Sequence, residues 1–180
     1  MTKVSTDWKT LSSKILLENK YLQILEDEVL RPDGKISHYY YRSRDPFSIV
    51  IPLKKNIVSL VRQYRYTVKS LSWEFPMGYV AGKNPYDSAV TELKEETGMS
   101  ADNIIEIGKF WVGVGSSNQS AHVYVAQDLK QGEATPEDGE FLELKEFTIA
   151  DVGVMIDKGE ILDGPTIVAY HYLEKYLKSI

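Results

Sequence analysis

Three glutamates, Glu92, Glu95 and Glu96, are the residues whose type and spacing most directly suggest chemistry in this chain. On a helix they would share one face, where they repel one another and lie near the negative end of the helix dipole. Carboxylates gathered in this way are typical of a site for hard divalent cations such as Mg²⁺, which prefer oxygen ligands. The alternative is a solvated acidic helix surface, the usual role of such a cluster when it stands alone.

The segment that carries these acids has helix signals at both ends. Asn84 is a favourable N-cap, Pro85 suits the first helical position, and Gly98 suits the left-handed turn after a helix. The helical period predicts one buried arc and an opposite, acidic arc. The predicted buried arc comprises Tyr86, Ala89, Val90, Leu93 and Thr97, and Ser88 joins the three glutamates on the other side.

The stretch from Gly78 to Met99 resembles the Nudix box, G-x5-E-x7-R-E-U-x-E-E-x-G-U, where U is aliphatic. Two features depart from that pattern. Thr91 stands where the box has arginine, and the loop after Gly78 is one residue short, with Lys83 or Asn84 in place of its glutamate. In the family these two positions mainly support the loop and orient the first catalytic glutamate, so the resemblance implies an altered support around intact metal-binding acids.

Segments outside the box are similar to those of ADP-ribose pyrophosphatases. Gln63-Tyr-Arg65 and Glu74-Phe-Pro-Met-Gly78 resemble their Q-[YF]-R and E-[LF]-P-A-G motifs. Pro136-Glu-Asp-Gly-Glu140-Phe resembles the acidic loop that bears their general base, and Gly159-Glu-Ile-Leu-Asp-Gly-Pro-Thr166 resembles the start of their last helix.

The resemblance assigns a role to each matching residue. Glu92, Glu95 and Glu96 would bind Mg²⁺, with Mn²⁺ as a possible substitute, and the backbone carbonyl of Met77 would complete the metal site. Glu140 would be the catalytic base. The expected substrate contacts are Arg65, Arg62 and Glu74, where a guanidinium matches phosphate oxygens. From the residues alone, Arg65 could equally be a surface arginine paired with an acid, and Arg62 is predicted on the other strand face.

The predicted fold class is α+β. Strands are expected at residues 21–30, 35–44, 48–53, 57–63, 71–75, 104–112, 121–126 and 141–147, with closing helices at 151–158 and 165–177. The resemblance sharpens this to the α/β/α sandwich of the Nudix fold over residues 46–180. Residues 1–45 would form an added N-terminal antiparallel sheet.

The N-terminal extension is expected to join two subunits. As a strand, residues 38–42 would place Tyr39 and Tyr41 on one face and Tyr40 on the other. Packing within the sheet is the simpler role for each of these aromatics. In the resembled subfamily the extension is exchanged between subunits and its aromatics enclose the adenine, so we expect a homodimer with a composite site, to which Tyr39 and Tyr41 contribute.

Composition is ordinary for one globular domain and excludes several classes. The 180 residues carry a net charge of −5 without a basic run, which argues against nucleic-acid binding. No stretch approaches the roughly 20 apolar residues of a membrane span, and no secretory signal is visible at the N-terminus. There is no cysteine. A cytoplasmic location is therefore the default expectation.

The predicted function is Mg²⁺-dependent hydrolysis of the pyrophosphate bond of ADP-ribose to AMP and ribose 5-phosphate. Two alternatives remain open. One is hydrolysis of another nucleoside diphosphate sugar, such as GDP-mannose or UDP-glucose, because the diphosphate chemistry is shared. The other is a non-catalytic Nudix module that binds a nucleotide, although such modules usually lose box glutamates.

Overall fold

The computed structural model describes residues 5–79, 82–136 and 138–180. They divide into two compact units. The first contains the chain up to Asp45 together with Trp111–Ser120, and the second contains Pro46–Phe110 and Ala121–Ile180. In this described part of the chain, no helix is long and apolar enough to cross a membrane.

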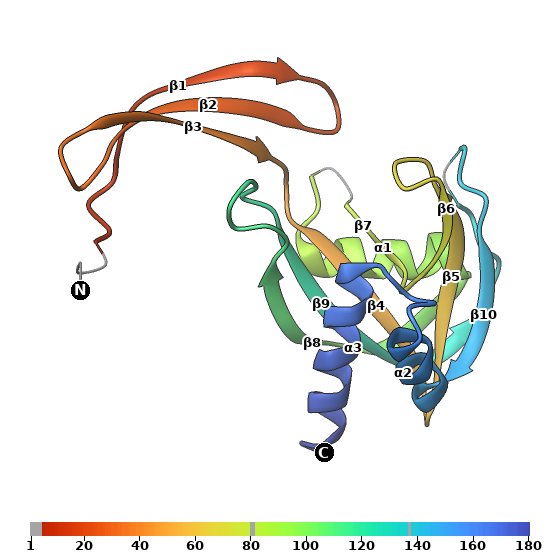
Figure 1. The fold of residues 1–180 in the computed structure, drawn as a ribbon. Helices are drawn as coiled ribbons and strands as arrows, with labels where there is room; N and C mark the ends of the chain where they lie inside the picture. Colours follow the sequence, from red (N-terminus) through yellow and green to blue (C-terminus); the bar gives the residue numbers. More distant parts are fainter. Residues whose placement is uncertain (1–4, 80–81, 137) are drawn as a thin grey trace. The chain divides into compact units, whose positions relative to one another are not determined.

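The first unit is built on an antiparallel sheet of β1 (Lys9–Glu18), β2 (Gln23–Leu30) and β3 (Ile36–Ser43), in that order (Figure 1). The predicted hairpin between β2 and β3 is confirmed, with Gly34 at a φ of +78° in its turn. The sequence did not predict β1, because its residues lack a clear alternation of apolar and polar side chains. Every residue of β1 is exposed.

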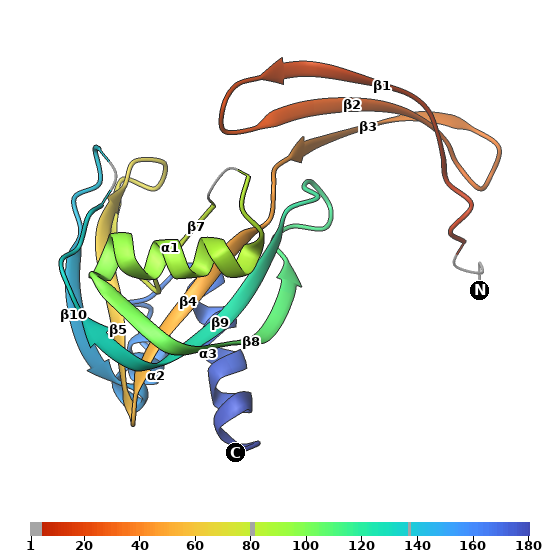
Figure 2. The same ribbon diagram turned by 180° about the vertical axis from the view of Figure 1, so that it is seen from behind.

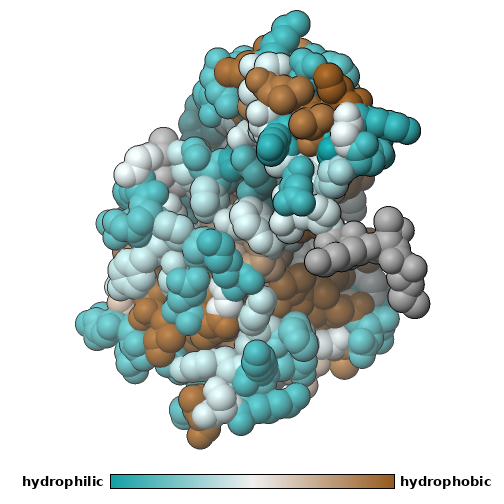
Figure 3. Space-filling view, turned by 90° about the vertical axis from the view of Figure 1, so that its left-hand side faces the viewer, coloured by the Kyte–Doolittle hydropathy of each residue, from teal (hydrophilic) through white to brown (hydrophobic). Residues whose placement is uncertain are grey.

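Apolar side chains gather on the surface of this sheet, towards the top of Figure 3. Those at least 44% exposed include Leu11, Ile15, Leu16, Leu17 and Ile36. The segment Trp111–Ser120 is joined to the end of β3 by backbone hydrogen bonds, one of which runs from the Arg42 amide to the Ser116 carbonyl over 2.9 Å.

The second unit is built on a mixed sheet with the strand order β10-β5-β4-β9-β8. The strands are β4 (Phe47–Lys54), β5 (Ile57–Arg65), β8 (Met99–Trp111), β9 (Ser120–Gln131) and β10 (Glu143–Thr148). Two shorter strands, β6 (Ser70–Glu74) and β7 (Met77–Gly78), pair with β5 and β4. Strand β4 pairs with β9 in parallel. The pairs β4–β5, β4–β7, β5–β6 and β5–β10 are antiparallel.

Helices cover both faces of this sheet. α1 (Pro85–Thr97) lies on one face, and α2 (Ile149–Asp157) and α3 (Gly164–Leu177) lie on the other (Figures 1 and 2). The larger apolar cluster, with Ile49, Leu60 and Phe75, joins the sheet to α2 and α3, while a smaller cluster packs under α1. These layers confirm the predicted α+β sandwich.

Candidate active site

Helix α1 begins and ends as its sequence predicts. The Asn84 side chain accepts a hydrogen bond of 2.9 Å from the Asp87 amide, and Gly98 has a φ of +72°. The predicted buried arc is partly wrong, because Tyr86 and Val90 are 47% and 40% exposed while Ser88 and Glu96 are buried. The helix is therefore turned so that an acidic residue, rather than two apolar ones, faces the interior.

Glu96 is the most unusual of the three acids. It is only 5% exposed, and its Oε2 atom has no hydrogen-bond partner among the described residues. Burial, with the nearby charges of Glu92 and Glu140, raises the pKa of Glu96 to about 9. A buried carboxylate without compensation is costly, so this position needs either a proton or a cation.

Glu92 lies directly against the backbone of Gly78, the last residue of β7. A Cβ atom added at Gly78 would come within 2.3 Å of the Glu92 Oε1 atom, so only glycine allows this approach. Met77, the predicted carbonyl ligand, is the neighbouring residue in β7 and pairs with Ile49 of β4. The structure thus brings Glu92 beside the glycine that follows Met77.

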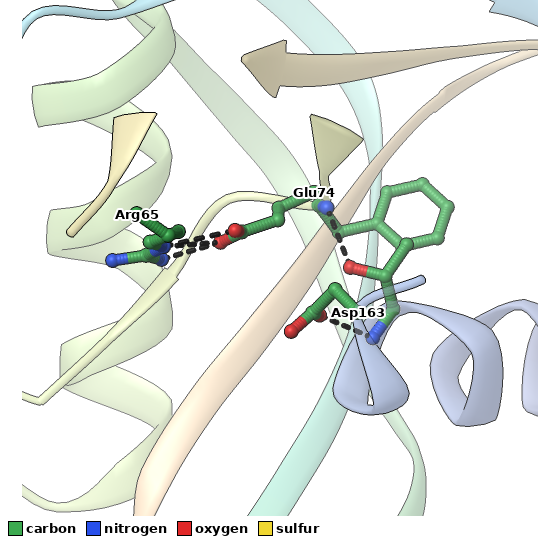
Figure 4. A network of polar contacts seen from close by, with 5 residues as sticks. Arg65, Glu74 and Asp163 are labelled. Carbon is green, nitrogen blue, oxygen red and sulfur yellow. Dashed lines mark hydrogen bonds and ion pairs between the residues drawn. The ribbon is translucent and has the colours of Figure 1, made fainter. Parts of the chain in front are cut away.

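Arg65 and Glu74 form an ion pair between β5 and β6. The Arg65 Nε donates to Glu74 Oε1 over 2.9 Å, and its Nη2 also binds this carboxylate, whose side chain is 2% exposed. The two side chains point towards one another in Figure 4. Arg65 therefore pairs with an acid, as the simpler interpretation held, yet its side chain stays 41% exposed and its charge still acts on Glu96.

Sequence reasoning missed Asp163, the N-cap of α3. Its carboxylate accepts a hydrogen bond of 2.8 Å from the Thr166 amide, and the Thr166 hydroxyl accepts one of 3.2 Å from the Phe75 amide. Figure 4 places Asp163 near the Arg65–Glu74 pair. These bonds fix the start of α3 to the end of β6. The match of residues 159–166 to the last-helix motif was the available signal, since it includes this aspartate.

Arg62 has partners of its own on the edge of the sheet. Its Nε donates to Glu143 of β10 over 2.9 Å, and its guanidinium lies 5.0 Å from the centre of the Trp73 ring. A phosphate-binding role for Arg62 stays a prediction, and it would require the side chain to leave these contacts.

The acidic loop is tied to the end of α1. The Gly132 amide donates to the Gly98 carbonyl over 2.8 Å, and the Thr135 amide donates to the Glu95 carbonyl over 3.0 Å. The loop continues to Glu140, which is close enough for its charge to raise the pKa of Glu96. The predicted base and the predicted metal-binding acids therefore share one electrostatic environment.

Lys83 is one of the two residues that could stand in place of the box glutamate, and Thr91 stands in place of the box arginine. The Lys83 Nζ donates to the Thr91 hydroxyl over 2.6 Å, and this hydroxyl donates to the Asp87 carbonyl over 2.9 Å. The bond links the loop before α1 to the residue that precedes Glu92. It supplies a connection between the two altered positions.

Tyr39 and Tyr41 lie in the first unit, on β3. The Tyr39 hydroxyl donates to the Gly115 carbonyl over 3.2 Å, while burial and the neighbouring Asp27 raise the pKa of Tyr41. The pairing of β3 with β2 places Tyr39 opposite Asp27 and Tyr41 opposite Leu25, so both point to one face of the sheet, as the alternation predicts. Their contact with a nucleobase stays a prediction.

The residues around Glu96 fit a divalent cation. Glu96 has a buried oxygen with no hydrogen-bond partner in the part of the chain that the structure describes, and burial together with the charges of Glu92, Glu140 and Glu74 raises its pKa. Within residues 5–79, 82–136 and 138–180, no three Asp, Glu or His side chains form a complete metal cluster by themselves. Mg²⁺ commonly retains several waters and uses only one or two carboxylates with substrate phosphates, so it does not require such a cluster.

Comparison with known proteins agrees with this arrangement. The model of the NUDIX domain matches residues 42–169, and the model of the nucleoside diphosphate sugar hydrolase N-terminal domain matches residues 8–41. The chain belongs to the Nudix family. Because Nudix enzymes are pyrophosphohydrolases that generally use divalent cations, the family agrees with the chemistry expected of these acids.

Relatives of this Nudix protein match it over nearly its whole length. An ADP-ribose pyrophosphatase of Bacillus subtilis is 26% identical over 174 residues, covering 94% of each chain. A methanol dehydrogenase activator of Bacillus methanolicus is 27% identical over 170 residues, covering 92% of each. The crystal structure of an ADP compounds hydrolase superposes with a TM-score of 0.87 at 20% identity, over 99% of this chain and 98% of that one, and confirms the predicted Nudix fold.

Proposed function

We propose that this Nudix protein hydrolyses the pyrophosphate bond of ADP-ribose to AMP and ribose 5-phosphate, with Mg²⁺ as cofactor and Mn²⁺ as a possible substitute. The observation that carries the proposal is the buried Glu96 oxygen, which has no hydrogen-bond partner among the described residues and lies near the charges of Glu92, Glu140 and Glu74. The name of the Bacillus subtilis relative supports ADP-ribose as the substrate.

The metal is held in this proposal by Glu92 and Glu96, with Glu95 and the Met77 carbonyl completing the site. Bound there, the cation supplies positive charge against the diphosphate and polarises its P–O bonds. Other residues of the chain support the acids and the substrate. Gly78 lets the backbone approach Glu92, and the exposed part of Arg65 faces the substrate.

Glu140 acts as the general base. It takes a proton from the attacking water as the water oxygen bonds to phosphorus, and the P–O bond to the bridging oxygen breaks. The bridging oxygen leaves with the other phosphate. The hydrogen bonds between residues 132–135 and the end of α1 support this role, because they fix the start of the base loop to the helix that carries the acids.

A substrate panel tests the proposal. Full-length protein with Mg²⁺ is incubated separately with ADP-ribose, GDP-mannose and UDP-glucose, and the products are separated by chromatography. We expect ADP-ribose to be converted to AMP and ribose 5-phosphate with the highest kcat/KM, and EDTA to stop the reaction. Preference for GDP-mannose or UDP-glucose would favour the second candidate, which the match to the nucleoside diphosphate sugar hydrolase N-terminal domain supports.

Binding without hydrolysis of any of these compounds would contradict an enzymatic role. It would instead favour the non-catalytic nucleotide-binding module. The retention of Glu92, Glu95 and Glu96 supports the enzyme.

A homodimer with a composite site is part of the proposal. Its support is the exposed apolar surface of the first unit, where Leu11, Ile15 and Leu17 of β1 are 48–51% exposed. Such a surface is typical of an interaction site, and C2 dimers are the commonest closed assembly. Light scattering at micromolar concentration should give twice the 20.5 kDa of one chain. The proposed location is the cytoplasm, which fractionation of the source cells would check.

A further inference from the structure

A cavity of about 630 Å³ opens beside the Arg65–Glu74 pair. One wall is the turn between β5 and β6 together with β6 itself, and the opposite wall is the loop between α2 and α3. All of its lining residues belong to the second unit, so the cavity is complete within that unit. Its volume falls within the range of about 300–1,000 Å³ that is usual for small-molecule sites.

The cavity and the acids of α1 have Arg65 and Glu74 as common neighbours. Arg65 and Glu74 line the cavity, and the charges of both act on the carboxyl group of Glu96. A diphosphate bound at the acids would therefore leave one of its two substituents next to this opening. The cavity wall is also firmly held, because Phe75, which follows Glu74, bonds to Thr166 at the start of α3.

The charges of the lining argue against a phosphate group inside the cavity. Glu74, Glu160 and Asp163 supply three carboxylates, whereas Arg65 supplies a single guanidinium that already binds Glu74. A phosphate group inside the cavity would meet net negative charge. Carboxylates instead accept hydrogen bonds well from neutral hydroxyl groups, and such bonds to a charged acceptor are stronger than neutral ones.

The rest of the lining suits a sugar ring. Hydroxyl groups of Thr67, Ser70 and Ser72 can both donate and accept hydrogen bonds. Leu162 and Val68 line the same cavity and are 80% and 67% exposed, so they offer apolar contact to the C–H groups of a ring.

We propose that this cavity binds the terminal sugar of the nucleoside diphosphate sugar, with Glu160 accepting hydrogen bonds from its hydroxyl groups and Leu162 packing against its ring. The inference rests on the proposed function and deepens it. The residues that distinguish one sugar from another then lie in the loop between α2 and α3, outside the Nudix box.

The test compares two substrates that differ only in the terminal group. ADP-ribose carries the sugar, and the β-methyl ester of ADP keeps the adenosine and the diphosphate but replaces the sugar by a methyl group. The wild-type protein should show a kcat/KM at least about 10-fold higher for ADP-ribose. Glu160→Gln should lose about 10-fold in kcat/KM with ADP-ribose, as expected for the loss of hydrogen bonds to a charged group, and should not change with the methyl ester.

A second variant fills the cavity without removing a charge. Leu162→Trp alters an exposed side chain, so folding should be preserved, and it should also reduce kcat/KM for ADP-ribose alone. Glu146→Gln on the exposed side of β10, away from this cavity, is the matched control and should behave as wild type with both substrates. Circular dichroism and the melting temperature of each variant confirm that the fold is intact.

Each result decides the inference. Equal losses with both substrates would place the adenosine, rather than the sugar, in the cavity and would overturn it. Unchanged activity of both variants with ADP-ribose, or a wild-type protein that does not distinguish the two substrates, would also overturn it while leaving the proposed hydrolysis intact. A wild-type protein that hydrolyses neither substrate nor any other nucleoside diphosphate sugar would instead contradict the proposed function itself.

Discussion

The two sheets of this molecule differ in how much of their surface is covered by other elements. In the second unit, β4 has six buried residues in succession, because helices cover both faces of its sheet (Figures 1 and 2). In the first unit every residue of β1 is exposed, although the strand contains Leu11, Ile15, Leu16 and Leu17. Strand formation alone therefore does not determine burial, which depends on what covers each face.

The two units are therefore expected to have different roles. The second unit has its own core and contains the acids, Arg65, the acidic loop with Glu140 and the cavity. The first unit carries Tyr39, Tyr41 and an exposed apolar surface of a kind that is typical of interaction sites. Changes in the second unit should therefore affect the chemical step, whereas changes in the first should affect assembly and substrate binding.

The largest effect is expected from Glu140→Gln. Loss of the proposed base should lower kcat about 10²–10⁴-fold with little change in KM, measured with saturating Mg²⁺ and ADP-ribose. Asp138→Asn in the same loop is the matched control and should do much less. Glu137→Gln should also do little, although Glu137 lies outside the described residues. A larger loss at Asp138 or Glu137 would mean that the base has been assigned one turn of the loop away from its true position.

Glu96→Gln should lower kcat at least about 10²-fold, because it removes the charge of a proposed metal ligand and keeps the size of the side chain. The same assay over a range of Mg²⁺ concentrations should show that excess metal does not restore full activity. Unchanged Mg²⁺-dependent hydrolysis in this variant would contradict the metal site. Gel filtration should show no change in assembly, since the residue lies in the second unit.

Tyr39→Ala should raise KM for ADP-ribose about 10-fold or more and leave kcat nearly unchanged. The reason is the loss of an aromatic surface on which the adenine would stack. In a composite dimer, Tyr39→Ala and Glu140→Gln chains should complement each other. Mixing equal amounts after subunit exchange should restore about a quarter of the wild-type activity at low substrate concentration, since half of the dimers would contain one intact site. No recovery despite demonstrated exchange would rule out a shared site.

Lys83→Met should reduce kcat about 5-fold and raise the Mg²⁺ concentration needed for half-maximal rate. The reason is the loss of one hydrogen bond, worth about 1 kcal/mol, that links the loop to Thr91 beside Glu92. Lys94→Met is the matched control, because Lys94 is an exposed lysine on α1, the helix that carries Thr91 and Glu92. If both variants have the same activity and metal dependence, the Lys83–Thr91 bond does not position Glu92.

The last effect concerns stability in EDTA rather than activity. The folded protein binds the Glu96 proton more tightly than the unfolded chain, since the folded pKa is about 9 rather than 4.5. The free energy of unfolding should therefore fall as pH rises from about 4.5 to about 9. Glu96→Gln should remove this part of the slope and be more stable than wild type by about 1–3 kcal/mol near pH 9. Urea unfolding of both proteins at several pH values measures the difference.

Much of the fold could be predicted because local signals and tertiary packing agree. Asn84 and Gly98 mark the two ends of α1 in both sequence and structure, and the hairpin of β2 and β3 follows from its turn. The rotation of α1 could not be predicted. A helical period treats Glu96 as a solvated acid, whereas in the structure it is buried and feels the charges of Arg65 and Glu74 from distant strands.

The site shows the same limit. Motif resemblance indicated Arg65 and Glu74 separately, but their ion pair depends on the register of β5 and β6, in which Arg65 is opposite Ser70 and Val61 is opposite Glu74. The Lys83–Thr91 bond joins two departures from the box that lie eight residues apart in the sequence. Such pairings are set by three-dimensional contact and leave no trace in spacing along the chain.

The segment Trp111–Ser120 has a practical consequence for anyone who wishes to produce a minimal catalytic fragment. It connects β8 and β9 of the second unit, yet it belongs to the first and bonds to the end of β3 through Ser116 and Asn118. A truncated chain that simply starts at Pro46 would keep this loop and lose its partners. A shorter, polar β-hairpin turn in place of the loop would therefore belong in any such fragment.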